Sequence, residues 1–248
     1  MLKLKNINVT LGGPAQLARQ VLNNLSLNVC PGEFVVIIGG NGAGKSTLFN
    51  VISGFLKPDS GQVLIDGSCV TDIPVTARSG LVAKVMQDPK VGTMENMTIF
   101  ENMAFALKRG QRRRITPFFS CSNRKFFQKK LQSLNMGLEN MMDELVCNLS
   151  GGQRQALSLI MSVVADAKIL LLDEITAALD PSSSNAIMQL TAELIKAEKR
   201  TCVMITHDMN QAIKYGDRLL LLKNGSFSVE YDAYTKSTLT PSNLVSRF

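Results

Sequence analysis

The chemistry of this chain is most visible in a glycine-rich stretch at residues 39–47. It satisfies the pattern G-x-x-x-x-G-K-[ST], in which glycines let successive backbone N–H groups turn toward phosphate oxygens. A helix that follows such a loop presents its positive end to the same phosphates. Lys45 is predicted to reach the β- and γ-phosphates, and the Ser46 hydroxyl to ligate Mg²⁺. The predicted nucleotide contacts of this loop are Gly39, Asn41, Gly42, Ala43, Gly44, Lys45, Ser46 and Thr47.

Two carboxylates, Asp173 and Glu174, follow an apolar stretch at 169–172. Open α/β sheets bind ligands at the carboxyl ends of their strands, where the phosphate-binding loop is also expected. Asp173 is therefore placed to hold Mg²⁺, directly or through water. Glu174 is the candidate base that polarises the water attacking the γ-phosphate. Taken alone, the pair could also be the solvated end of a strand.

A third motif reads Leu-Ser-Gly-Gly-Gln at residues 149–153. Ser150 and Gln153 have the spacing of a capping box, which would open a helix at this point and leave its N-terminus as another anion site. Together with the phosphate-binding loop, the motif resembles the signature of the ABC ATPases over nearly the whole chain. The resemblance implies that Ser150, Gly151, Gly152 and Gln153 contact the γ-phosphate of ATP held by an opposite subunit.

Three further residues match this family in order and spacing. Gln87 resembles the glutamine that reaches the Mg²⁺ and water region and couples it to a helical subdomain. Asp180 resembles an aspartate at the dimer interface, and before Pro181 it is also expected to cap a helix. His207, the one histidine of the chain, resembles the switch histidine that touches the γ-phosphate. The implied catalytic set is Glu174, His207 and Gln87, and the implied Mg²⁺ ligands are Ser46, Gln87 and Asp173.

The chain departs from the family pattern at two places. Family members usually carry an aromatic residue near the end of the first strand, which stacks on adenine, and the corresponding position here is Leu11. Adenine is then expected to pack against aliphatic side chains. Ile175 stands where proline commonly follows the catalytic glutamate, a change expected to alter the loop backbone only slightly.

The elements that position these motifs follow from hydrophobic periodicity. Apolar strands alternate with amphipathic helices, which predicts a mostly parallel sheet. Strands are expected at 3–9, 21–29, 34–38, 62–65, 169–172 and 202–206, and helices at 45–55, 151–164 and 181–198, with a helical region at 95–148 broken near residues 116–117. The resemblance implies an α/β P-loop NTPase fold with a RecA-like core (1–86 and 153–248), an N-terminal antiparallel β subdomain and an inserted helical subdomain (87–152).

The composition is that of a globular protein, with 45% hydrophobic and 19% charged residues. Nine basic residues lie between Asn102 and Leu138 without an acidic one, and removing them from the net charge of +7 leaves −2 for the rest of the chain. This cluster could be a solvated face, or a surface for anionic lipid or an acidic partner. Nucleic acid is not expected, because aromatic residues are not interleaved with a basic groove. The five cysteines form no C-x-x-C pair, so reduced thiols, mostly in the core, are expected.

The resemblance implies an ATPase that uses ATP and Mg²⁺ and drives a separate transmembrane permease. Its expected partners are that permease, a second copy or a related ATPase, and a separate substrate-binding protein. It would lie in the cytoplasm on the inner face of the membrane, and import is favoured over export. Residues 97–102, 108–114 and 176–180 resemble ATPases of bacterial uptake systems for small organic solutes, including aromatic amino acids. The alternatives are a soluble ABC ATPase acting in assembly or regulation, and a P-loop kinase.

Overall fold

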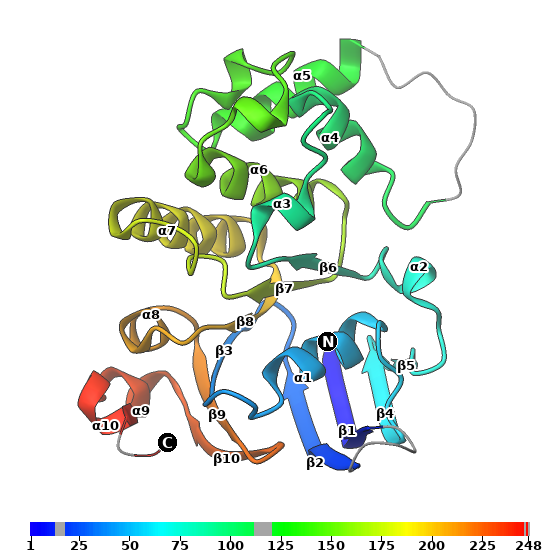
Figure 1. Cartoon of the computed structure of the whole chain (residues 1–248), viewed down its shortest axis with the longest axis vertical. Helices are drawn as coiled ribbons and strands as arrows, with labels where there is room; N and C mark the ends of the chain where they lie inside the picture. Colours follow the sequence, from blue (N-terminus) through cyan, green and yellow to red (C-terminus); the bar gives the residue numbers. More distant parts are fainter. Residues whose placement is uncertain (13–17, 112–120, 246, 248) are drawn as a thin grey trace.

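The computed structural model describes residues 1–12, 18–111, 121–245 and 247, and its strands form two sheets (Figure 1). The first sheet is antiparallel and has the order β2-β1-β4-β5. Its strands are β1 (Leu2–Leu11), β2 (Arg19–Val29), β4 (Ser60–Ile65) and β5 (Ser68–Cys69). The alternating burial of β1 and β2 places one apolar face against the rest of the molecule.

The second sheet is the core of the molecule and has the order β10-β9-β3-β8-β7-β6. All its pairings are parallel except that of β10 with β9. Its strands are β3 (Phe34–Ile38), β6 (Val82–Val85), β7 (Ile169–Asp173), β8 (Thr201–Ile205), β9 (Arg218–Lys223) and β10 (Ser226–Tyr231). Because both faces of this sheet are covered, its central strands read as continuous apolar runs.

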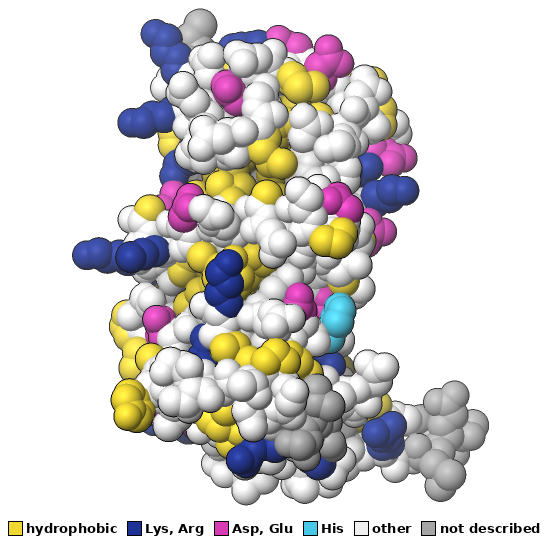
Figure 2. Space-filling model, turned by 90° about the vertical axis from the view of Figure 1, so that its left-hand side faces the viewer, with side chains coloured by type: hydrophobic (Ala, Val, Ile, Leu, Met, Phe, Trp, Pro, Cys, Tyr) yellow, Lys and Arg dark blue, Asp and Glu magenta, His cyan; other side chains and the backbone are white. Residues whose placement is uncertain are grey.

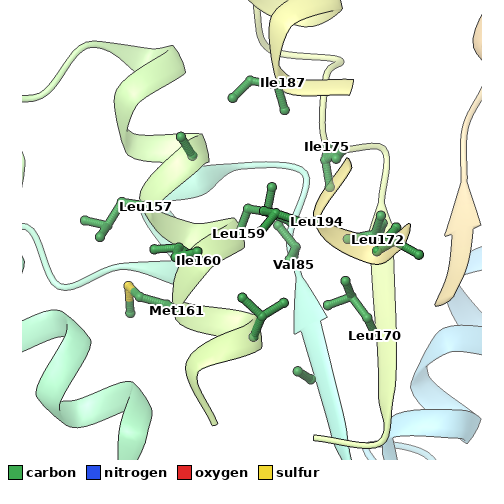
Figure 3. Close-up of a cluster of buried hydrophobic side chains, with 14 of the residues drawn as sticks. Val85, Leu157, Leu159, Ile160, Met161, Leu170, Leu172, Ile175, Ile187 and Leu194 are labelled. Carbon is green, nitrogen blue, oxygen red and sulfur yellow. The ribbon is translucent and has the colours of Figure 1, made fainter. Parts of the chain in front are cut away.

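Helices pack on the two faces of the core sheet (Figure 1). On one face, α1 (Lys45–Ser53) shares a hydrophobic cluster with the antiparallel sheet. On the other face, α6 (Gly151–Val164) and α7 (Pro181–Glu198) pack on β6 and β7, and Figure 3 shows their apolar side chains meeting in one cluster. The C-terminal part of the chain contributes α8 (Met209–Lys214), α9 (Ala233–Ser237) and α10 (Pro241–Val245).

The remaining helices lie between the end of β5 and the start of α6. They are α2 (Val75–Arg78), α3 (Pro89–Gly92), α4 (Ile99–Leu107), α5 (Cys121–Gln132) and the 3₁₀ turns Leu138–Asn140 and Val146–Asn148. A capping box between Thr98 and Glu101 opens α4, and α4, α5 and α6 share the larger hydrophobic cluster. Within the ranges described, every helix is too short or too polar to cross a lipid bilayer.

The sequence-based elements agree with the structure at most positions. The strand 34–38 and the helices 151–164 and 181–198 are confirmed at both ends. The helix predicted to reach residue 55 ends at Ser53, because Gly54 adopts a left-handed conformation (φ 84°) that terminates it, and Phe55 is 71% exposed instead of facing the core. The break predicted near residues 116–117 lies outside the described residues.

The expectation that most cysteines are core residues is wrong for three of the four whose side chains are described. Cys202 is buried in β8, whereas Cys30, Cys69 and Cys147 are exposed. These three lie in turns or in the short edge strand β5, where hydrophobic periodicity carries no information.

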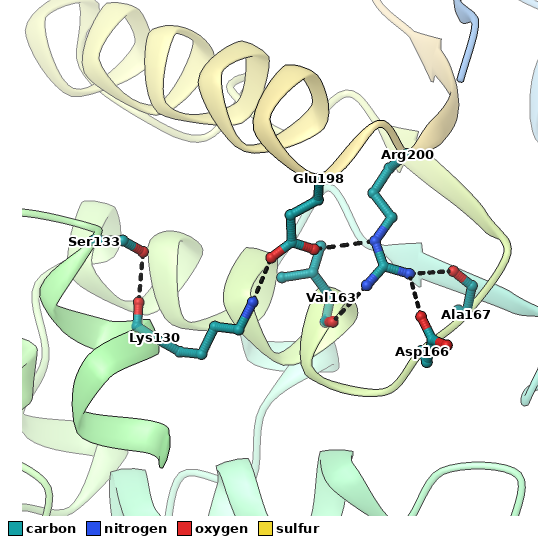
Figure 4. Close-up of polar contacts among 7 residues, drawn as sticks. All are labelled: Lys130, Ser133, Val163, Asp166, Ala167, Glu198 and Arg200. Atoms are coloured by element: carbon teal, nitrogen blue, oxygen red, sulfur yellow. Dashed lines mark hydrogen bonds and ion pairs between the residues drawn. The ribbon is translucent and has the colours of Figure 1, made fainter. Parts of the chain in front are cut away.

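The basic cluster is partly neutralised by acidic residues from other segments. Arg124 on α5 pairs with Asp143, with Nη1 to Oδ1 at 2.8 Å. Lys130 pairs with Glu198 at the end of α7, and Glu198 also accepts a hydrogen bond from Arg200 at 3.0 Å (Figure 4). Although burial opposes it, these hydrogen bonds lower the pKa of Glu198. Arg112, Arg113 and Arg114 lie outside the described residues, so the role of the cluster toward lipid or a partner stays a prediction.

Arg78 is the largest fully buried side chain, with 2% exposure. Its guanidinium donates to the carbonyls of Val51 and Ile52 in the last turn of α1, at 2.8 and 3.3 Å. It also donates to the carbonyls of Val70, Thr71 and Ile73 in the segment after β5. A cation at this position satisfies carbonyls that a helix end leaves free and complements the helix dipole.

We expect Arg78→Met to lower the free energy of unfolding by about 3 kcal/mol, because several buried carbonyls lose their donor. Urea unfolding of the two proteins measures this difference. Arg124→Met is the matched control: it breaks an exposed pair and should cost much less than Arg78→Met. Equal effects of the two substitutions would contradict the buried-cap interpretation.

Lys236 on α9 is 3% exposed, and its ammonium donates to the carbonyls of Tyr215 and Gly216 just after α8, the latter at 2.6 Å. Burial lowers the pKa of Lys236 to about 8, against the opposing effect of nearby Asp217. Below this pKa both the folded and the unfolded chain hold the proton. Between pH 8 and 10.5, the ordinary pKa of lysine, Lys236 is protonated more fully in the unfolded chain than in the folded one. The free energy of unfolding therefore rises with pH in this range.

The stability advantage of the wild type over Lys236→Met should therefore grow from pH 8 to pH 10, by at most about 1.4 kcal/mol per pH unit. Urea unfolding at pH 7, 8, 9 and 10 tests this expectation. Because all other titratable groups are the same in both proteins, their contributions cancel in the difference between the two free energies of unfolding. An advantage that stays flat or shrinks across this window would rule out the proposed titration.

Candidate functional site

The phosphate-binding loop connects the buried strand β3 to α1, as the sequence predicts. Gly39 has no room for a side chain, since a Cβ there would lie 2.5 Å from the carbonyl oxygen of Leu222. Gly44 precedes α1 with φ 105°, a conformation that favours glycine. The Lys45 ammonium donates to the carbonyls of Gly39 and Gly40 at 2.7 and 3.1 Å, so it lies folded over the loop.

A cavity of about 280 Å³ opens beside this loop. It is lined by Arg19, Val21, loop residues 41–47 and Glu174. The loop therefore shares one space with the predicted base, although the two are more than a hundred residues apart in the sequence. The N-terminus of α1 faces this region, which suits a negatively charged ligand.

Arg19 is a residue of the site that the sequence analysis missed. It lies on β2 and lines the loop cavity as well as a second cavity of about 200 Å³, which is also lined by residues 40–43. Its guanidinium lies 3.5 Å from the carbonyl oxygen of Gly42. Within the described part of the chain, no carboxylate pairs with it. The sequence offered one sign of this role: Arg19 is a single cationic residue on the strand before β3, which leads into the phosphate-binding loop.

Leu11, the predicted aliphatic neighbour of adenine, ends β1 and is 43% exposed. It lines neither of the two loop cavities, but its partner in the strand register is Arg19, which lines both. The β2 side of the loop cavity thus consists of one aliphatic and one cationic side chain, Val21 and Arg19. The role of Leu11 stays a prediction.

The two predicted carboxylates lie at the carboxyl end of β7, as expected. Glu174 adopts a positive φ of 47°, which is uncommon for a residue other than glycine, and its N–H donates to the carbonyl of Ile205 on β8. Ile175 is 2% exposed and packs in the larger hydrophobic cluster. Its burial helps to hold the backbone that directs Glu174 into the loop cavity. Asp173 forms an ion pair with Lys84 of β6, with Nζ to Oδ2 at 2.9 Å.

His207 follows β8 and contacts the predicted base directly. Its Nδ1 lies 3.2 Å from Oε2 of Glu174, and its side chain is 64% exposed. Figure 2 shows this histidine, the cyan side chain, on the surface of the molecule. An exposed imidazole next to a partly buried carboxylate can orient it and can meet a ligand arriving from solvent.

The signature residues begin α6, which packs on the face of the core sheet opposite α1. Ser150 and Gln153 form the predicted capping box of α6, with Gln153 N–H to Ser150 Oγ at 3.2 Å and Ser150 N–H to Gln153 Oε1 at 3.1 Å. None of residues 149–153 lines the loop cavity. In Figure 1, α6 lies on one side of the core sheet and α1 on the other. The helix end at Ser150 and Gly151 is exposed.

Gln87 and Asp180 also lie outside the loop cavity. Gln87 is exposed in the segment between β6 and α3. Asp180 caps α7 as predicted, accepting from the N–H groups of Ser182 and Ser183. Gln211 of α8, which the sequence analysis missed, joins the segment after Glu174 to the segment after His207. Its amide oxygen accepts a hydrogen bond from the Thr176 hydroxyl, and its amide nitrogen donates one to the Ser184 hydroxyl, both at 3.1 Å.

The predicted Mg²⁺ ligands fit that ion in their chemistry. Ser46, Gln87 and Asp173 offer a hydroxyl, an amide and a carboxylate oxygen, the hard donors that Mg²⁺ prefers. Among the described residues, no three His, Cys, Asp or Glu side chains gather into a metal site.

A phosphate-binding loop, a strand-end carboxylate pair and a carboxylate–histidine contact define a P-loop nucleoside triphosphatase. A family model described as ABC transporter matches residues 22–177. The chain belongs to the ABC transporter family, as an ABC-type ATPase whose hydrolysis is coupled to transport.

Several relatives resemble the chain in sequence. A tyrosine transport ATP-binding protein of Clostridioides difficile is 40% identical over all of this chain and 98% of that protein. A spermidine/putrescine import ATP-binding protein of Legionella pneumophila is 35% identical over 90% of this chain, and the choline transport ATP-binding protein OpuBA of Bacillus subtilis is 31% identical over 91%. The chain spans only 58% and 56% of these two longer relatives.

Solved structures show the same fold. A dimeric post-hydrolysis state of the ATP-binding cassette MJ0796, bound to ADP and Pi, superposes with a TM-score of 0.80 at 31% identity, covering 94% of this chain and 99% of that one. The ATP-binding cassette MJ1267 reaches a TM-score of 0.83 at 27% identity, covering 99% and 97%. The predicted fold class is confirmed.

We expect Arg19→Ala to weaken ATP binding about fivefold, because it removes a partly exposed cation from the rim of an anion site. Arg19→Lys should retain part of the affinity, since it keeps the charge and loses the planar fork. Titration of a fluorescent ATP analogue measures both affinities. Lys5→Ala, a loss of the same charge on the exposed side of β1, is the control. Unchanged affinity in Arg19→Ala would exclude a contact between Arg19 and the nucleotide.

Proposed function

We propose that this chain is the ATPase subunit of a bacterial-type importer for a small organic solute. In this proposal two subunits, identical or closely related, enclose two ATP molecules. The observation that carries it is the separation of the two anion sites of the chain. The loop cavity is lined by Glu174 but by no signature residue, and the helix end at Ser150 is exposed and lines neither loop cavity. One subunit therefore offers two incomplete halves.

Each half has a defined task in this proposal. Lys45 and the N–H groups of residues 41–47 bind the phosphates. Ser46, Asp173 and Gln87 would hold Mg²⁺, which would supply positive charge to neutralise the phosphates. The partner's copy of the signature helix donates to the γ-phosphate from Ser150 and Gly152, and Asp180 lies at the contact between subunits. ATP then joins the halves, and loss of the γ-phosphate releases them.

Glu174 is the proposed base of the hydrolysis step. Its carboxylate lines the loop cavity and would accept a proton from the attacking water, while His207 holds the carboxylate through the 3.2 Å contact. The positive φ of Glu174 and the hydrogen bond from its N–H to Ile205 fix the direction of the side chain. A water held in line with the γ-phosphate needs a fixed acceptor of this kind.

The proposed partners are a transmembrane permease on the cytoplasmic face of the membrane and a separate substrate-binding protein. The relative named as a tyrosine transport protein matches over its full length, which favours tyrosine or a similar aromatic amino acid as the solute. Uptake of labelled tyrosine by cells with and without the gene tests the assignment, with choline and spermidine uptake as controls. Loss of choline or spermidine uptake with intact tyrosine uptake would show that tyrosine is not the transported solute.

Glu174→Gln should bind ATP but hydrolyse it about 10²- to 10⁴-fold more slowly, the usual contribution of a general base. With Mg-ATP it should also accumulate as a dimer, because the triphosphate bridge is not removed. Phosphate release and light scattering after size exclusion measure the two effects. Lys45→Ala is the control that should lose nucleotide binding itself. Unchanged turnover would show that Glu174 is not the general base. A variant that stays monomeric in saturating Mg-ATP would contradict the proposal that two subunits enclose the nucleotide.

A further inference from the structure

The predicted Mg²⁺ ligand Asp173 already has a cationic partner in the protein. Lys84 is the third residue of β6, and its ammonium lies 2.9 Å from the Asp173 carboxylate. Lys84 pairs with Leu171 in the parallel register of β6 and β7, two residues before Asp173. The two side chains are only 12% and 16% exposed. The ion pair is therefore a partly buried contact between neighbouring strands and not a flexible surface pair.

The surroundings of Lys84 hold its ammonium at this position. The ammonium also lies 5.8 Å from the ring centroid of Phe49, a fully buried residue of α1. A cation at this distance from an aromatic face is attracted by the ring. Lys84 thus has a second contact that does not depend on Asp173. Phe49 lies on the helix that begins at Lys45, so Lys84 links the carboxylate end of β7 to the helix of the phosphate-binding loop.

We infer that Lys84 is a positioning residue that acts as the counter-ion of Asp173 in the nucleotide-free protein and sets the Mg²⁺ affinity of the site. The inference rests on the proposed role of Asp173 as a Mg²⁺ ligand. A carboxylate at this depth is costly without a cation beside it. Lys84 supplies that cation and orients the carboxylate. The same charge opposes a divalent cation that takes the same oxygens, since like charges a few ångströms apart repel.

Two effects of Lys84→Met follow from this arrangement. Without nucleotide, Asp173 is left without its partner, and the melting temperature should fall by about 4 to 8 °C. With ATP, the opposing charge is gone, and the Mg²⁺ concentration for half-maximal stabilisation should fall about three- to tenfold. A role confined to packing would lower stability but leave the Mg²⁺ concentration unchanged.

The test uses the full chain carrying Glu174→Gln, so that ATP is not consumed. Melting temperature is recorded in EDTA without nucleotide, and then with saturating ATP over a titration of Mg²⁺. Lys168→Met is the matched control: it also removes one lysine from an ion pair, with Asp66, but both partners are about half exposed. It should change neither quantity. Lys84→Gln, which keeps a donor without the charge, gives the Mg²⁺ measurement if Lys84→Met does not fold.

A half-maximal Mg²⁺ concentration that is unchanged or higher in the uncharged Lys84 variants would overturn the inference, as would an equal shift in Lys168→Met. Asp173→Asn separates this result from failure of the proposed function. If the parent shows no dependence on Mg²⁺, or if Asp173→Asn leaves that dependence intact, Asp173 is not the ligand. If Asp173→Asn abolishes it while the Lys84 variants match the parent, only the role of Lys84 is wrong.

Discussion

The register of three parallel strands determines where the chemistry of this molecule lies. Ile205 of β8 is level with Ile37 of β3 and with Asp173 of β7. The residues that come next in the chain therefore leave the sheet at the same edge. Because the strands are parallel, segments distant in sequence meet there without any local signal between them. The phosphate-binding loop, the candidate base and the histidine share a site for this reason.

Electrostatics explains which groups lie at the end of each of these segments. The loop uses glycines and the start of α1 to direct N–H groups outward, so it is ready for an anion. The carboxylates at the end of β7 require cations or donors, and the protein provides Lys84 for Asp173 and His207 for Glu174. Each of the two carboxylates at the end of β7 thus has a nitrogen partner within the protein. Arg19 is an addition at the rim that favours a polyanion.

Local signals in the sequence were enough for much of the fold and part of the site. The caps at Ser150 and Asp180 and the apolar run of β3 depend on residues within a few positions of one another, and they were predicted to the residue. The end of α1 was missed because Gly54 ends the helix through its backbone, whereas Phe55 continues the hydrophobic pattern. Arg19, Lys84 and Gln211 were missed because each acts on a residue far away in the sequence. The spacing of residues in the sequence does not predict such a long-range contact.

The N-termini of α1 and α6 differ in capping and in surroundings: α1 follows Gly44 without a side-chain cap, whereas a capping box of Ser150 and Gln153 opens α6. The start of α1 opens into a cavity that already contains a base, whereas the start of α6 is exposed on a helix that packs on the other face of the sheet. Within one chain, the residues that open α6 line neither of the two loop cavities. A phosphate that needs donors from both must receive the second set from another subunit. Under the proposed arrangement of two subunits, this is the reason that one subunit alone does not complete the site.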